Sequence, residues 1–392
     1  MQLKDRITLK IEKVAFGGDG VGRINNLVVF VPFAVPGDEL EVEITQCKKK
    51  YAHGKILKII KASPLRIEPL CIYFEKCGGC CYQHIKYEEQ LKIKRSQVKE
   101  TFLRIGKIQE PPVLPTLASS IAYHYRGKAQ CHQIMTSSGP RTGFLDVSGS
   151  KVQDIERCEI MEESINEKIG RLRKEVFYQK RVKDSRLTIW SDLTGEHAKK
   201  GQVKRIVKCK EFLVPFDGFF QNNLYLTDNL VDEVCQMALS GGQLNTVIDL
   251  FCGCGLFSIF LAPYANEVLG IELSPKAVKF AQINAEKENL KNIKFVCGDA
   301  GEELLKNFPM HSTKAIDLLI LDPPRIGCDQ SLLKAIAGLQ LSRIIYVSCN
   351  PATQARDIKF FKESGYRLLH IQPLDMFPQT QHIEVTALLV HE

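Results

Sequence analysis

Two segments near the end of the chain could supply a nucleophile and a base to one active site. Ser348-Cys349-Asn350-Pro351 follows an apolar, β-rich run, so we expect Cys349 where a buried strand ends and a loop begins. Open α/β sheets carry out their chemistry in such loops, and a thiol there suits attack on a soft carbon. Glu384 lies 35 residues downstream of Cys349 and could act as a general base.

Cysteine is more often a small buried hydrophobic residue than a nucleophile, and this chain has 14 cysteines. The flanking Asn350-Pro351 and the later Glu384 nevertheless favour catalysis at Cys349. We therefore predict Cys349 as the nucleophile and Glu384 as the base.

Acidic residues end four successive apolar runs in the second half of the chain. They are Asp249, Glu272, Asp299 and Asp322. The segment 251–255, Phe-Cys-Gly-Cys-Gly, follows the first run, but position 258 is Ser and no third glycine follows, so this is not a dinucleotide fingerprint. Each acidic residue alone could simply end a strand. Together they suit the ribose and adenine of a nucleoside, and their spacing favours S-adenosylmethionine over NAD.

A third group of residues could bind a metal. Three thiols lie within ten residues, at Cys71, Cys77 and Cys80. Thiolates at such spacing suit zinc or an iron–sulfur cluster, and spacing alone does not decide between them. A fourth ligand is needed, for which Cys158 is the candidate and Cys81 and Cys131 are rivals.

The elements that must position the nucleophile and the acidic residues fill the C-terminal part of the chain. From about residue 205, apolar strands alternate with segments of helix length. The expected strands are 246–250, 268–272, 293–297, 317–321 and 344–348. This alternation predicts a parallel, doubly wound sheet. We therefore expect a Rossmann-like α/β domain over 205–392.

The first half of the chain predicts two smaller domains. Over 1–62, alternating apolar residues and glycine turns predict a small β-barrel with a basic edge. Over 63–204 we expect a mixed α+β central domain that carries the cysteines, with short antiparallel strands and an amphipathic helix near 86–105. The apolar stripe expected for that helix is Leu91, Val98, Phe102 and Ile105, with Lys92, Lys94, Arg95, Lys99 and Arg104 on its other faces.

Composition narrows the class of protein. The 392 residues are 44% apolar and 25% charged, which is ordinary for a globular protein of two or three domains. No run of 18 apolar residues exists and the N-terminus lacks an apolar signal segment, so we expect a cytoplasmic protein without a membrane span. Its cysteines should then be thiols or metal ligands. The net charge of +8 favours a polyanionic partner, and we expect a monomer.

Several of these segments resemble, in order, the signatures of the RNA uracil-5-methyltransferase family. They are Phe219 to Asn223, Asp322 to Arg325, Ser348 to Pro351, Asp375 to Thr380 and His382 to Glu384. The resemblance spans essentially the whole chain, and its loose fit is the pair Cys252 and Cys254, which we interpret as small loop fillers. It implies that the methyl donor is contacted by Gln221, Phe251, Glu272, Asp299 and Asp322.

Further resemblances narrow the substrate. Residues 1–62 resemble a TRAM domain, an OB-like RNA-binding barrel. The ribosomal-RNA branch of the family carries a [4Fe-4S] cluster, and that resemblance, which includes Gln83 and His84, assigns the cluster to Cys71, Cys77, Cys80 and Cys158. It implies a 23S rRNA (uracil-5-)-methyltransferase with RNA as its partner.

Other functions fit the sequence less well. The same chemistry on a tRNA uridine stays open. A radical iron–sulfur enzyme that thiolates tRNA would need a Cys-x3-Cys-x2-Cys motif, which the sequence lacks, and a C-terminal TRAM domain. A non-catalytic RNA-binding protein would need neither Cys349 nor Glu384 in this order.

Overall fold

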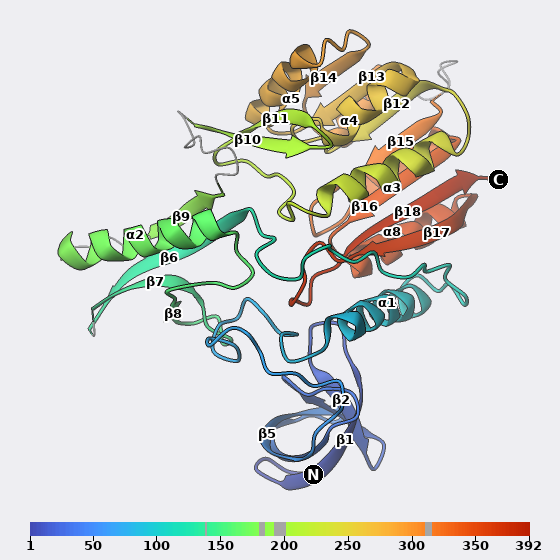
Figure 1. The fold of residues 1–392 in the computed structure, drawn as a ribbon. Helices are drawn as coiled ribbons and strands as arrows, with labels where there is room; N and C mark the ends of the chain where they lie inside the picture. Colours follow the sequence, from blue (N-terminus) through green and yellow to red (C-terminus); the bar gives the residue numbers. More distant parts are fainter. Residues whose placement is uncertain (138, 180–184, 192–200, 310–315) are drawn as a thin grey trace. The chain divides into compact units, whose positions relative to one another are not determined.

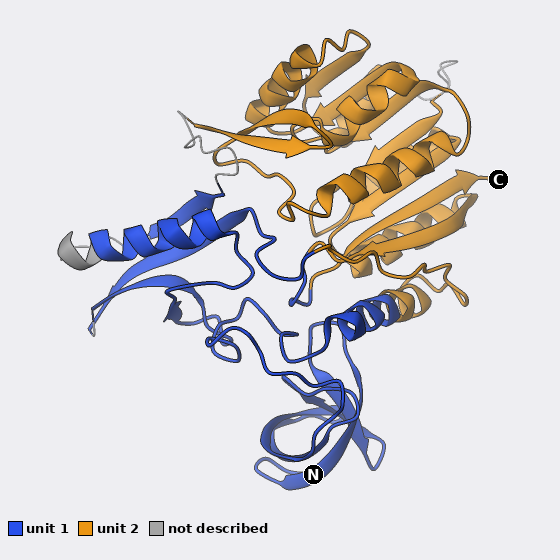
Figure 2. Cartoon of the chain, in the orientation of Figure 1, with its two compact units in different colours: residues 1–97, 121–191, 377–381 blue, residues 98–120, 192–376, 382–392 orange. Residues whose placement is uncertain are grey.

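The computed structural model describes residues 1–392 except 138, 180–184, 192–200 and 310–315. The chain forms two units, each built from separate stretches of sequence (Figure 2). Unit 1 comprises residues 1–97, 121–191 and 377–381, and unit 2 comprises residues 98–120, 192–376 and 382–392. None of the helices in the described ranges has the length and apolarity needed to cross a membrane.

Unit 1 begins with a closed five-stranded barrel (Figure 1). Its strands are β1 (Arg6–Val14), β2 (Gly20–Ile24), β3 (Leu27–Val31), β4 (Glu39–Cys47) and β5 (Tyr51–Lys61), in the order β1-β2-β3-β5-β4. Leu40, Val42 and Ile44 are fully buried, whereas the glutamates between them are partly exposed. Such alternation places one face of the strand on a core, so the expected N-terminal barrel is confirmed.

Unit 1 also contains an antiparallel sheet of four strands covered by one helix. The strands are β6 (Lys128–Thr136), β7 (Gly139–Leu145), β8 (Val152–Asp154) and β9 (Ser185–Trp190), in the order β8-β7-β6-β9, and the helix is α2 (Glu163–Gln179). Buried apolar residues of both layers, among them Cys131, Ile165 and Ile189, form their common core. The antiparallel strands expected in this part of the chain are therefore present.

Helix α1 (Tyr87–Arg104) is the helix expected near 86–105. The predicted environments of two residues, Lys94 and Ile105, were wrong. Lys94, expected among the solvated residues, is fully buried, and its Nζ donates to the carbonyl of Phe377 at 3.0 Å. A buried ammonium is tolerated where such acceptors replace water. Ile105, expected in the apolar stripe, is 41% exposed because the helix ends at Arg104.

Unit 2 is built on a seven-stranded sheet in the order β14-β13-β12-β15-β16-β18-β17. The five parallel strands are β12 (Leu244–Leu250), β13 (Ala265–Glu272), β14 (Ile293–Cys297), β15 (Leu318–Leu321) and β16 (Arg343–Ser348), which confirms the five expected strands. Two further strands, β17 (Tyr366–Leu374) and β18 (Glu384–His391), extend this sheet in antiparallel pairing and were not predicted.

Helices and one hairpin complete unit 2 (Figure 1). They are α3 (Thr227–Leu239), α4 (Leu256–Leu261), η1 (Ala262–Tyr264), α5 (Pro275–Lys287), α6 (Ala300–Asn307), α7 (Gln330–Gly338), α8 (Pro351–Glu363), β10 (Gln202–Val207) and β11 (Lys210–Pro215). The chain adds strands on one side of β12 as far as β14 and then returns to the other side at β15. Open α/β sheets bind ligands at such a reversal, outside the carboxyl ends of the strands.

Candidate active site

The pairing of β16 with β18 brings the predicted nucleophile and base together. Ser348, the last residue of β16, pairs with Val385, so Cys349 directly follows and Glu384 directly precedes one paired position. The buried side chain of Gln354 fastens the two strands, because its Nε2 donates to the Val385 carbonyl at 3.1 Å and to a β16 carbonyl at 2.8 Å. Gln354 was not identified from the sequence, where it is one polar residue of an amphipathic helix.

Neighbouring charges have opposite effects on the pKa of Cys349. Burial raises the pKa of the Cys349 thiol and the charge of Glu384 raises it further, whereas a hydrogen bond and the positive charge of Arg325 lower it. Burial and the charge of Asp322 raise the pKa of Glu384 well above its usual range, and Arg325 again opposes them. Nη2 of Arg325 lies 2.7 Å from Nδ1 of His382. Arg325 is therefore a cation that favours the anionic forms of both predicted catalytic residues.

The loop after β12 is held against the end of β13 by Glu272. Its Oε2 accepts from the amide of Gly253 at 3.1 Å, and its Oε1 accepts from the amide of Ser274 at 2.8 Å. Phe251 begins the loop with a φ of 65°, and its amide donates to a β13 carbonyl at 2.9 Å. A carboxylate has about four lone-pair sites, so the partly exposed Glu272 keeps acceptor capacity for the hydroxyls of a ribose.

Carboxylates also gather at the ends of β12 and β15. Asp249 is fully buried; its Oδ2 accepts from the amide and the hydroxyl of Ser258, at 3.0 and 2.5 Å, and its Oδ1 has no hydrogen-bond partner among the described residues. Burial, with the charge of Glu272, raises the pKa of Asp249 to about 7. Burial and then the charges of Asp249 and Glu272 raise the pKa of Asp322 to about 7.

Such a group of mutually repelling carboxylates favours a cationic ligand, because a positive charge relieves both their burial and their repulsion. S-adenosylmethionine carries a sulfonium and an ammonium, and its ribose hydroxyls could be bound by Glu272. The residues present therefore fit this methyl donor. Cys252 and Cys254 in the same loop are buried, as small loop fillers would be.

Two further candidates for donor binding have different surroundings. Asp299 is exposed and begins α6, where its Oδ1 accepts the amides of the first turn at 2.9 and 3.1 Å. Gln221 is buried. Asn223, the last residue of the signature from Phe219, is fully buried, and its side chain donates to the carbonyl of Met376 at 3.3 Å. Asn223 thereby holds the loop of Gln221 to the start of the segment that follows β17.

The predicted metal ligands lie close enough in unit 1 to interact electrostatically. Burial raises the pKa of Cys80 well above its usual range, and the charges of Cys158 and Cys77 contribute. Burial raises the pKa of Cys158 to about 12, with contributions from Cys77 and Cys71. However, no group of three or more His, Cys, Asp or Glu side chains in the described part of the chain is arranged to hold a metal ion.

Hydrogen-bond donors point at these sulfurs. The side chain of Gln83 hydrogen-bonds to Cys80, and backbone amides hydrogen-bond to the sulfurs of Cys71, Cys77 and Cys158. The Oε1 of Gln83 also accepts from the amide of Cys71 at 3.1 Å. Donors of this kind favour the thiolate form and tune sulfur ligands in metal sites.

The comparisons with known proteins agree with the geometry of unit 2. Residues 204–392 match the family model described as tRNA (Uracil-5-)-methyltransferase, and residues 4–57 match that of the TRAM domain. An uncharacterized RNA methyltransferase of Halalkalibacterium halodurans is 33% identical, over 98% of this chain and 97% of the relative. One of Clostridium tetani is 32% identical, over 95% and 94%.

A solved structure is similar over the whole chain. It is the tRNA (uracil-54, C5)-methyltransferase of Pyrococcus abyssi in complex with S-adenosyl-L-homocysteine. Its TM-score is 0.73 at 26% sequence identity, covering 98% of this chain and 100% of that one. The fold is thus that of an S-adenosylmethionine-dependent RNA methyltransferase. The chain belongs to the RNA uracil-5-methyltransferase family and carries an N-terminal TRAM domain.

The position of Arg325 predicts a change in the reactivity of Cys349. Arg325→Met removes the charge that lowers the pKa of Cys349 and of Glu384, so both pKa values should rise. At a given pH less thiolate forms, and the alkylation of Cys349 by iodoacetamide should move to higher pH, as measured by mass spectrometry of its peptide. Arg367→Met, at an exposed arginine of β17, is the matched control and should leave the profile unchanged. An Arg325 variant with the unchanged profile would contradict this role.

Proposed function

We propose that the chain methylates C5 of a uridine in RNA through a covalent bond between Cys349 and C6 of the base. C5 of uracil is a poor nucleophile, so it has to be activated before it can accept a methyl group. Addition of the Cys349 thiolate to C6 breaks the ring conjugation and leaves an enolate with electron density on C5. The pairing of β16 with β18, which sets Glu384 beside Cys349, is the observation that carries this proposal.

The remaining steps return the enzyme to its starting state. S-adenosylmethionine, when bound, supplies the methyl group that C5 takes. Glu384 then removes the proton from C5, the electron pair re-forms the double bond, and the bond between C6 and the sulfur of Cys349 breaks. Burial and Asp322 make Glu384 a stronger base than a free carboxylate, because they raise its pKa. The balance leaves 5-methyluridine, S-adenosylhomocysteine and one proton.

The RNA that we propose as substrate is 23S rRNA. The resemblance of the cysteine set to the ribosomal branch supports it, together with the N-terminal TRAM domain. A tRNA uridine is the second candidate, because the similar Pyrococcus abyssi enzyme is a tRNA methyltransferase. Mapping 5-methyluridine in total RNA from a deletion strain distinguishes them: loss from 23S rRNA supports the first candidate, and loss from tRNA alone refutes it.

We further propose a [4Fe-4S] cluster on Cys71, Cys77, Cys80 and Cys158, held in the cytoplasmic protein as a folding element of unit 1. The proposal rests on the resemblance of the cysteine spacing, and on the mutual charge effects and hydrogen bonds of these four thiols. A bound cluster would stabilise their thiolates, and its binding free energy would contribute to folding. The radical thiolating enzyme gains no support from either family model.

A covalent intermediate tests the role of Cys349. With 5-fluorouridine at the target position, Cys349 can add to C6 and C5 can take the methyl group, but Glu384 meets fluorine where it needs a proton. RNA should therefore stay bonded to the protein during denaturing electrophoresis, and only when S-adenosylmethionine is supplied. Cys349→Ala should abolish the complex, whereas alanine at Cys252 or Cys254 should preserve it. Glu384→Gln should trap a similar adduct on ordinary uridine, and a Cys349→Ala enzyme that still methylates would refute the assignment.

Donor binding tests the role of Glu272. Glu272→Ala should weaken binding of S-adenosylmethionine by about 1.5–3 kcal/mol, the worth of a hydrogen bond to a charged group, or roughly ten- to a hundredfold in Kd. Glu286→Ala, at an exposed glutamate of α5, is the control. Calorimetry measures both affinities, and RNA binding should be unaffected. An unchanged donor affinity in the Glu272 variant would exclude this contact.

Metal analysis tests the cluster. Protein purified without oxygen should be brown and contain about four irons per chain, and Cys77→Ala should remove both colour and iron and lower the melting temperature. Cys131→Ala changes a cysteine of the apolar core under α2 and should retain the iron. Stoichiometric zinc without iron in the anaerobic protein would rule the assignment out.

A further inference from the structure

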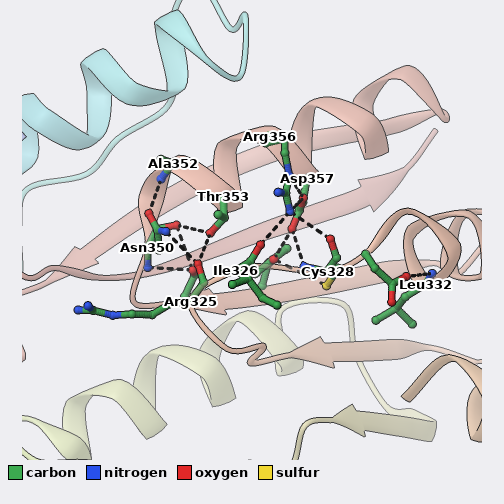
Figure 3. A network of polar contacts seen from close by, with 12 residues as sticks. Arg325, Ile326, Cys328, Leu332, Asn350, Ala352, Thr353, Arg356 and Asp357 are labelled. Atoms are coloured by element: carbon green, nitrogen blue, oxygen red, sulfur yellow. Dashed lines mark hydrogen bonds and ion pairs between the residues drawn. The ribbon is translucent and has the colours of Figure 1, made fainter. Parts of the chain in front are cut away.

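The loop between β15 and α7 is held by polar side chains of α8 and of its N-cap residue Asn350 (Figure 3). Nδ2 of Asn350 and Oγ1 of Thr353 both donate to the carbonyl of Arg325, at 2.9 and 3.2 Å. One turn further along the helix, Nη2 of Arg356 donates to the carbonyl of Ile326 at 3.1 Å. Residues three apart share a face of a helix, so this face of α8 binds successive carbonyls of the loop.

A buried carboxylate closes this arrangement. Asp357 is fully buried; its Oδ2 accepts from the amide of Cys328 at 3.0 Å and from the hydroxyl of Tyr346 at 2.7 Å, and its Oδ1 accepts from Arg356 at 2.7 Å. Gly327 has a φ of 76°, and a Cβ there would lie 2.6 Å from Oδ2 of Asp357. The main chain of the loop is thus fixed by hydrogen bonds and by close packing.

Ile326 projects from this fixed loop into solvent, with 76% of its surface exposed. Single exposed apolar residues are common and need no function by themselves. The position of Ile326 is more informative, because the preceding residue is Arg325, whose side chain hydrogen-bonds to Cys349. Ile326 is thus an exposed apolar side chain on a hydrogen-bonded loop, one residue from the arginine that contacts the predicted nucleophile.

We propose that Ile326 inserts beside the target uridine and fills the space that this base leaves in the RNA stack, a role that rests on the proposed methylation of uridine. A stacked base cannot present C6 to Cys349, so the uridine has to leave the stack. Its departure costs stacking energy, and proteins that unstack bases commonly insert an apolar wedge such as isoleucine. The hydrogen bonds from α8 let Ile326 enter without further ordering of the loop.

Other exposed apolar residues of unit 2 fit this role less well. Leu273 and Phe219 are 68% and 66% exposed. Leu273 follows Glu272, and Phe219 lies two residues before Gln221, so both belong to the segments predicted to bind the methyl donor. Ile326 differs from them because its neighbour Arg325 contacts the nucleophile.

Two transcripts test the proposal. Both contain the uridine whose methylation is lost in the deletion strain, and in the second the nucleotides on each side of it are abasic, so that little stacking remains to be replaced. Ile326→Ala should lower kcat/KM on the first transcript by roughly tenfold, a modest share of the cost of unstacking a base, and change it little on the second. Ile326→Met should restore most of the activity.

The control is Ile206→Ala, at a 57% exposed isoleucine of β10, which should behave as the parent enzyme on both transcripts. Melting temperatures should match, because an exposed side chain contributes little to the core. Equal losses on the two transcripts, or no loss on the first, would overturn the role of Ile326. A parent enzyme that methylates neither transcript would instead overturn the proposed function.

Discussion

The antiparallel pairing of β16 and β18 is the interaction on which the candidate active site depends. Cys349 and Glu384 are joined by a long stretch of chain, and only the register that pairs Ser348 with Val385 sets them side by side. A shift of one residue would turn the side chains of a strand to the opposite face. The buried Gln354 stabilises this register, because its side chain donates a hydrogen bond to a carbonyl on each strand.

The charged side chains of the candidate site shift the pKa values of their neighbours. Burial and the charge of Glu272 raise the pKa of Asp249, and burial with the charges of Asp249 and Glu272 raises that of Asp322. A cationic ligand would offset this cost. The positive charge of Arg325 lowers the pKa of Cys349 and that of Glu384, so it favours the thiolate and the carboxylate. Asp322 lies within electrostatic reach of both groups of residues, because its charge also raises the pKa of Glu384.

The segment that precedes the base is anchored in unit 1. The carbonyl of Gln379 accepts from the amides of Cys81 and Tyr82, both at 3.0 Å. Its Oε1 accepts from Nε2 of the buried Gln90 at 2.9 Å, and its main-chain amide donates to Oε1 of Gln90 at 3.1 Å. Cys81 directly follows Cys80, one of the proposed cluster ligands. Folding of the segment that contains Cys80 and Cys81 is therefore coupled to residues 377–381.

Local sequence alone determined much of this protein. Alternating apolar residues such as Leu40, Val42 and Ile44 specify a half-buried strand, and continuous apolar runs specify the buried parallel strands, because side chains must match the faces they occupy. The acidic strand ends and Cys349 followed from the same reasoning, since the carboxyl ends of parallel strands converge at one edge of a sheet.

Tertiary structure decided what depends on partners distant in sequence. The burial of Lys94 depends on an acceptor carbonyl at Phe377, and the double role of Arg325 depends on strands that follow it in the chain. Strands β17 and β18 were not predicted. A short apolar run does not specify whether it joins a sheet or in which direction it pairs, because its partners lie elsewhere in the chain. The sequence places Cys71, Cys77 and Cys80 within ten residues of one another. Whether their sulfurs can bind a metal depends on the fold, because the fold sets the geometry of the ligands.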